Sequence, residues 1–177
     1  MALSFMPSSS MTLDVVVTCD PAINATPEQA ERYLETGDIK VLDPHAGATI
    51  FCLKALSPVE REEAEVRAGA YTRSELGRHL WIKEPINSEE RARWHHALTS
   101  DEREALGEYK AYLNRVFVEM VNAALVSVDG VPVKQGESPL DLVRPESHRV
   151  QVIAELVRHV QRMSLLEIGR ASCRERV

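Results

Sequence analysis

The sequence contains few of the motifs on which enzyme chemistry usually depends. It has no GxSxG, P-loop, GxGxxG or HExxH motif, and no serine stands at a strand-to-helix elbow that would expose a nucleophile. The acidic run from Glu60 to Glu65 has no neighbouring acid–base partner, so we interpret it as a solvated helix face. We therefore expect no catalytic residue, no bound cofactor and no enzymatic activity.

Metal-binding patterns are also missing. Of the six histidines, two are adjacent, His95 and His96. Neighbouring residues of a helix point about 100° apart, so this pair cannot face one ion without strain. His148 and His159 share a helix face but lie about three turns apart. We interpret all four as ordinary surface or boundary histidines and predict no metal site.

The chain also lacks a secretion signal and a long apolar run, and it has no basic patch outside its last ten residues. Its 27 Asp and Glu residues outnumber its 21 Lys and Arg residues, and the net charge of −6 would repel nucleic-acid phosphates. The N-terminal segment MALSFMPSSSM has no basic start before an apolar core, and no stretch approaches the ~18 apolar residues of a membrane span. We expect a soluble cytosolic protein with a disordered leader at residues 1–10, and no nucleic-acid or membrane partner.

The C-terminal segment differs in composition from the rest of the chain. Ile168 to Val177 resemble the translation of a common short-read sequencing adapter, which predicts that residues 167–177 are a non-native tail. Without the three arginines and one glutamate of residues 168–177, the net charge changes from −6 to −8. Only Cys19 and Cys52 then remain, far apart and outside any CxxC motif, so we interpret them as small apolar residues of strands. Residues 11–166 are predicted to form a single globular domain.

Two strand patterns open the structured part of the sequence. Residues 13–19, LDVVVTC, are rich in β-branched side chains and end at an Asp-Pro pair. Residues 48–56 alternate in polarity and place Phe51 and Leu53 on the same face. We predict that these strands pair as a small antiparallel sheet.

Helix starts follow, most of them marked by a capping residue. Thr26 opens a capping box before a short helix that ends at Gly37. The same signature at Ser57, and a cap at Asn87 or Ser88, open two more helices. The segment AYTRSELGRHLWIKEP between them is less regular. It offers four large apolar residues for burial: Leu76, Leu80, Trp81 and Ile82.

The strongest pattern predicts a long helix over about residues 100–125. Thr99 and Glu102 form a capping box at its start, and apolar residues then recur at steps of three and four. Tyr112 and Val118 lie at the margin of this stripe; we favour burial beneath another element, and contact with a partner is the alternative. The stripe expected to face the core comprises Leu106, Tyr109, Leu113, Val116, Phe117, Met120, Val121 and Ala124.

The remaining elements complete an α+β plan. Trp94 either anchors its helix to the core, which we favour, or contacts a partner. An Asp-Gly turn at Asp129 follows the long helix, but Pro132 argues against a long hairpin. A last helix, about residues 146–163, should pack on the long helix. Its apolar face comprises Val150, Ile153, Leu156, Val157 and Val160. The predicted fold is a small N-terminal antiparallel β pair with a mostly helical remainder.

Several short phrases occur in an order that is typical of one protein family. Phe51 to Ser57 matches an F-x-L-(K/R)-x-L-(S/T) phrase that opens a helix. A glycine turn at Val128 to Pro132 and an acidic Pro/Leu loop at Ser138 to Pro145 precede a closing helix at Val150 to Leu166. This order resembles the small tail-morphogenesis proteins of tailed bacteriophages, in particular the tail assembly chaperones. The resemblance spans most of residues 48 to 166.

The resemblance implies a non-enzymatic factor in the cytoplasm of the bacterial host. Such a factor binds the tape measure protein during tail morphogenesis, with the tail tube protein as a second candidate partner. An acidic surface would keep the complex soluble, and an apolar groove would bury amphipathic client helices. Two alternatives stay open: a structural head-tail or tail virion component that forms a ring, and a small cytosolic enzyme or regulatory domain with an unrecognised pocket. The candidate partner-binding residues are Trp94, Tyr112 and Val118.

Overall fold

The computed structural model describes residues 12–42, 46–69, 75–133 and 146–174, and within the last segment the side chains of residues 150–164. Across these residues the chain forms a four-stranded sheet and six α-helices, so the predicted α+β class is confirmed. Three predictions lie outside the described residues: the leader at 1–10, the Pro/Leu loop at 138–145 and the side chain of His148.

The sheet is small and antiparallel, with the strand order β1-β2-β3-β4. β1 (Thr12–Val15) pairs with β2 (Phe51–Lys54), which confirms the predicted antiparallel pair. β3 (Leu125–Val128) adds to the other edge of β2, and β4 (Val131–Pro132) follows as the outer strand. β2 buries alternate side chains, as its sequence predicts.

β1 ends earlier than predicted because side chains from distant helices take over its backbone hydrogen bonds. The Tyr33 hydroxyl accepts from the Val16 N–H and donates to the Val16 carbonyl, at 3.0 Å in each case. The Glu155 carboxylate accepts from the Thr18 N–H at 2.6 Å and from the Thr18 hydroxyl at 2.7 Å. Because these groups satisfy the backbone without a ladder partner, the predicted strand over residues 13–19 is regular only through Val15.

The turn between β3 and β4 forms a short hairpin. Asp129 and Gly130 have positive φ angles of 48° and 77°, as a two-residue primed turn requires. The Asp129 N–H donates to the Ile50 carbonyl at 2.8 Å, and the Asp129 carboxylate accepts from the Ile50 N–H at 2.7 Å. β4 comprises only two residues, and the Val133 N–H after it still donates to the Val126 carbonyl at 3.0 Å. The hairpin is therefore short, as the sequence indicates.

Capping residues set the starts of most helices. Complete capping boxes at Thr26, Ser57 and Thr99 precede α1 (Pro27–Thr36), α2 (Pro58–Arg67) and α5 (Ser100–Ala124). The Asn87 side chain caps α4 (Ser88–Ala97). The remaining helical elements are the 3-10 helix η1 (Ile39–Leu42), α3 (Glu75–Lys83) and α6 (Glu146–Arg174). α6 continues past its predicted end at Met163, and no proline interrupts it.

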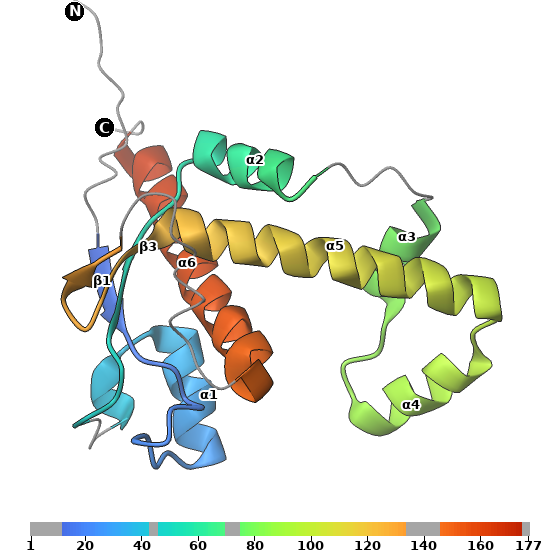
Figure 1. Ribbon diagram of the computed structural model, residues 1–177, viewed down its shortest axis with the longest axis horizontal. Helices are drawn as coiled ribbons and strands as arrows, with labels where there is room; N and C mark the ends of the chain where they lie inside the picture. The colour runs from blue at the N-terminus through green and yellow to red at the C-terminus, as the bar shows by residue number, and fades with distance from the viewer. Residues whose placement is uncertain (1–11, 43–45, 70–74, 134–145, 175–177) are drawn as a thin grey trace, which may run out of the picture.

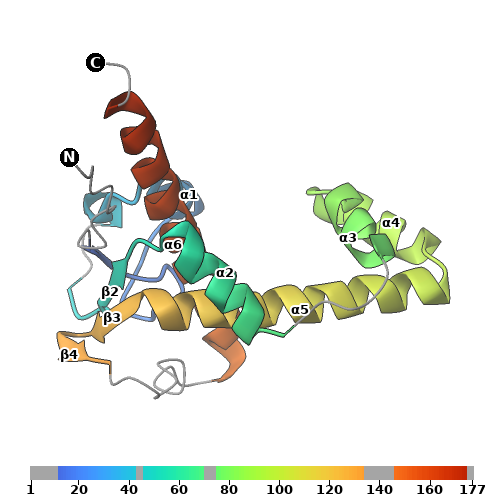
Figure 2. The same cartoon turned by 90° about the horizontal axis from the view of Figure 1, so that it is seen from above.

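The long helix α5 joins two parts of the molecule (Figures 1 and 2). The first part, which we call the body, comprises the sheet, α1, η1, α2, α6 and residues 112–124 of α5. The second part, the arm, comprises α3, α4 and residues 100–111 of α5, and it lies away from the sheet. α6 packs on α5 in the body, as predicted, and α3 packs along α5 in the arm. None of the described helices is long and apolar enough to cross a membrane.

The body holds the main hydrophobic core, and the arm has a small cluster of its own. Residues from β1, β2, α2, α5 and α6 build the main core, with Leu53, Val121 and Leu156 fully buried at its centre. A second body cluster attaches α1 and η1; it comprises Val16, Tyr33, Leu42 and Ala48. The arm cluster comprises Leu80, Leu98 and Leu106, with Trp94 packed against it.

Two predicted apolar faces are only partly buried. The α5 stripe is half-buried in its middle, where the arm meets the body, at Tyr109, Leu113 and Phe117. On α6 the predicted core residues Ile153, Leu156, Val157 and Val160 are buried. Val150 is 69% exposed, so its assignment to the core is wrong. Its spacing fits the stripe, but burial on the described part of α6 begins only at Val152, where neighbouring elements first cover the helix.

Candidate functional site

A groove, which we call the arm groove, lies where the arm meets the body, between the end of α3, the linker to α4 and the middle of α5. It has a volume of about 420 Å³ and is open to solvent. Large apolar side chains and three charged groups form its walls. They are Trp81, Glu84, Pro85, Ile86, Arg91, Lys110, Leu113, Asn114 and Phe117.

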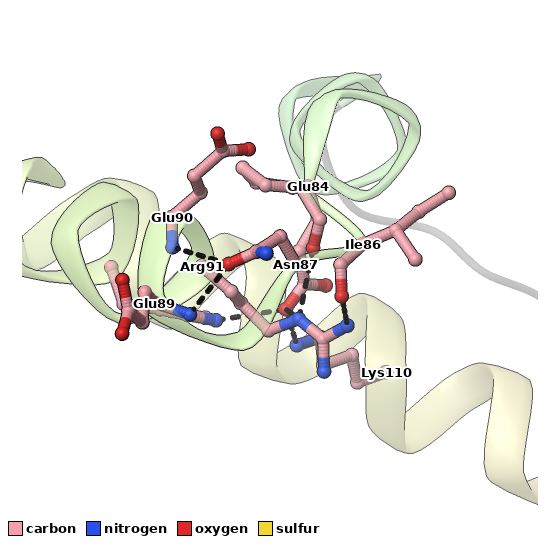
Figure 3. Close-up of polar contacts among 9 residues, drawn as sticks. Glu84, Ile86, Asn87, Glu89, Glu90, Arg91 and Lys110 are labelled. Carbon is pink, nitrogen blue, oxygen red and sulfur yellow. Dashed lines mark hydrogen bonds and ion pairs between the residues drawn. The ribbon is translucent and has the colours of Figure 1, made fainter.

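Glu84 fixes one wall of the groove by joining side chains of α4 and α5 (Figure 3). Its Oε1 lies 2.8 Å from Lys110 Nζ, 2.8 Å from His95 Nε2 and 3.9 Å from Arg91 Nε. Only 9% of the Glu84 side chain is exposed. Burial alone would raise the pKa of Glu84, but hydrogen bonds from Lys110 and His95 outweigh burial and lower it. The carboxylate therefore stays charged at neutral pH and ties the end of α3 to both helices.

The linker between α3 and α4 is held by its own polar contacts. The Arg91 guanidinium donates to the Pro85 carbonyl at 2.9 Å and to the Ile86 carbonyl at 2.7 Å. Asn87 Oδ1 accepts from two backbone N–H groups in the first turn of α4, at 2.9 Å and 3.2 Å. Because both ends of the linker are fixed, the Ile86 side chain is held in solvent, where the residue is 93% exposed (Figure 3).

Trp81 stands beside the groove at the end of α3. Lys110 Nζ lies 5.5 Å from the centroid of its ring, a cation–π contact that links the ring to α5. Trp81 is 41% exposed, and Leu76 and Ile82 are exposed as well. Of the four residues that the sequence offered for burial, only Leu80 is buried, because α3 turns one narrow face toward α5.

The three charged groups of the groove are engaged within the arm, and this determines what the groove can bind. Lys110 donates a hydrogen bond to Glu84 and makes a cation–π contact with the Trp81 ring. The Arg91 guanidinium donates to the carbonyls of the linker. The remaining surface is mainly apolar. Such a surface suits the apolar face of an amphipathic helix better than bond-making chemistry.

The described lining of the groove includes none of the three residues proposed from the sequence as partner contacts. Trp94 is half-buried against the arm cluster, with its ring 5.2 Å from the His95 ring, in the anchoring position that we favoured. Tyr112 and Val118 are half-buried against the main core, so another element covers each of them in part.

The groove residues themselves were missed at the sequence level. The available signal was a tryptophan and an isoleucine, Trp81 and Ile86, on either side of Pro85. Their exposure depends on how α3 and α4 pack on α5, and no local pattern encodes that packing.

A second polar cluster lies inside the body, where α1 meets α6. The Tyr33 ring lies 5.0 Å from the His159 ring, and Arg162 Nη2 lies 3.3 Å from His159 Nδ1. His159 is only 1% exposed, so its interpretation as a surface or boundary histidine is wrong. α1 covers α6 at this point, and the helical spacing of α6 alone does not reveal that cover.

Burial changes the protonation of this second cluster. Burial, followed by the nearby Arg162 charge, lowers the pKa of His159 to about 4, so the imidazole is neutral at pH 7. Burial likewise raises the pKa of the Tyr33 hydroxyl. Because His159 is enclosed and Glu155 is occupied by Thr18, neither group can meet a substrate in this conformation.

Among the described residues, no three His, Cys, Asp or Glu side chains gather closely enough to hold a metal ion. Comparisons with protein-family models, curated proteins and solved structures gave no match.

Proposed function

We propose that the protein is a tail assembly chaperone-like factor of a bacteriophage, acting in the cytoplasm of the bacterial host. It binds the tape measure protein during tail morphogenesis, without catalysis, and the tail tube protein is a second candidate partner. The arm groove receives the apolar face of an amphipathic helix of the client. The observation that carries this proposal is the open groove with Trp81 and Ile86 exposed beside it.

The spacing of the groove floor supports a helical client. Four residues of α5 line the groove, at positions i, i+3, i+4 and i+7: Lys110, Leu113, Asn114 and Phe117. They form one face of a helix over two turns, a length of about 10.5 Å. A client helix that packs alongside would bury the equivalent face of its own two turns.

The charge of the chain supports the same role. With a net charge of −6, copies of the protein repel one another. A factor of this kind would keep an aggregation-prone client in solution while the groove covers its apolar segments. The charge and the groove would thus both oppose aggregation of the client.

Replacing Ile86 tests the proposal. Ile86→Asp should weaken binding of the tape measure protein from the same genome at least about tenfold, or about 1.4 kcal/mol. The new carboxylate would have to lose its water to enter the interface. Isothermal titration calorimetry with the purified client would measure the change.

Val131→Asp is the matched control, since Val131 is an exposed valine on β4, which lies at the opposite end of α5 from α3 and α4 (Figure 2). It should leave the affinity unchanged. Equal affinities for the wild type and Ile86→Asp would refute the groove as the client site. Failure of all three chains to bind would refute the proposed function itself.

A further inference from the structure

His159 is enclosed in a position that accommodates only its neutral ring. Arginine only donates hydrogen bonds, so the 3.3 Å contact from Arg162 Nη2 requires His159 Nδ1 to be an unprotonated acceptor. The ring proton then lies on Nε2, which is buried and has no hydrogen-bond partner among the described residues. A second proton would have to bind at Nδ1. There it would break the contact with Arg162 and place one cation beside another.

The same residues hold α1 against α6. The Tyr33 ring packs against the His159 ring. The Tyr33 hydroxyl accepts a hydrogen bond from the Val16 N–H and donates one to the Val16 carbonyl. At the end of α1, Gly37 lies so close to the Arg162 guanidinium that a Cβ there would overlap it. His159 and Arg162 therefore lie beneath both the middle and the end of α1.

We propose that Tyr33, His159 and Arg162 form an acid-sensitive clasp, which releases α1 from α6 when His159 takes up a proton. The clasp is in the body and does not depend on the function proposed for the arm groove. Its release would loosen the cluster that attaches α1 and η1, and with it the chain that follows β1.

The groups around His159 do not compensate an added positive charge. On α6, Glu155 lies one turn away, but both of its oxygens accept hydrogen bonds from Thr18. On α1, the facing group is the neutral Tyr33 hydroxyl. The remaining charge is that of Arg162, which opposes protonation.

The size of the effect follows from proton linkage. Once α1 is released, His159 would bind a proton near its ordinary pKa of 6.5, whereas the closed form binds one only near pH 4. The closed clasp is therefore fully stable above pH 6.5 and loses stability as the pH falls toward 4. Between pH 7.5 and pH 5, the opening equilibrium should rise about 30-fold.

Hydrogen–deuterium exchange on the full chain, corrected for intrinsic exchange rates, tests the proposal. Protection of α1 should fall about 30-fold between pH 7.5 and pH 5, while protection of α5 stays constant. His159→Phe keeps a ring against Tyr33 but cannot be protonated, and should abolish the pH effect. The clasp is refuted if α1 of the wild type stays protected at pH 5. It is also refuted if α1 of His159→Phe loses as much protection between pH 7.5 and pH 5 as α1 of the wild type.

A measurement on the wild type alone keeps the proposal testable even if His159→Phe does not fold. The imidazole signal of His159 can be followed by NMR from pH 8 to pH 4. It should begin to titrate only together with signals of α1. A His159 that titrates near pH 6.5 while α1 signals stay unchanged would overturn the clasp.

Discussion

At the scale of single residues, Glu155 connects α6 to the chain after β1. The residue is 5% exposed, and its two oxygens accept from the N–H and the hydroxyl of Thr18. Hydrogen bonds to a buried charge contribute more than neutral ones. Glu155→Gln removes the charge and turns one acceptor into an NH2 group, which meets Gln151 Nε2 and forces the Thr18 hydroxyl to turn from donor to acceptor. We expect it to lower the free energy of unfolding by about 2 to 3 kcal/mol in urea titrations at pH 7.

An exposed glutamate provides the control for this residue. Glu63→Gln, on the solvent side of α2, should change the free energy of unfolding by less than about 0.5 kcal/mol. If Glu155→Gln unfolds at the same urea concentration as the wild type, the Thr18 contacts do not stabilise the fold. In that case the Glu155 hydrogen bonds would not be the reason that β1 ends at Val15.

At the scale of elements, the end of α1 depends on a glycine for two reasons. Gly37 has a φ of +67°, and the Arg162 guanidinium occupies the space that a side chain would need. Gly69, after α2, has a φ of +88° with open space around it. Alanine at either position strains the backbone by about 1 kcal/mol, but only at position 37 does it also displace Arg162.

Comparing the two substitutions isolates the contact between α1 and α6. Gly37→Ala should lower the free energy of unfolding by about 2 kcal/mol, and Gly69→Ala by about 1 kcal/mol, in the same urea titration. Equal losses at the two glycines would show that Arg162 moves aside freely and does not hold α1.

Local patterns predicted the elements well wherever the cause was local. Capping boxes at Thr26, Ser57 and Thr99 depend on residues three positions apart, and the helices begin where these boxes place them. The end of β1 depends instead on Tyr33 and Glu155, and the latter is 137 residues away from Thr18. No spacing within residues 13–19 could have shown that the strand would stop at Val15.

At the scale of the whole molecule, the separation of arm and body creates the candidate site. It also explains why the site could not be predicted from the sequence. α5 carries one apolar stripe, and the body and the arm cover its two ends. The middle of the stripe, at Leu113 and Phe117, stays half-buried and becomes the floor of the groove. A stripe read from the sequence predicts burial but not which part of it lacks a neighbour.

The central claim is that the client lies in the arm groove. A photo-crosslinking residue placed at Ile86, with one at Val131 as the reference, would locate the client directly in the assembled complex. We predict that the tape measure protein crosslinks from position 86 and not from position 131. A complex that forms but crosslinks only from position 131 would contradict the claim.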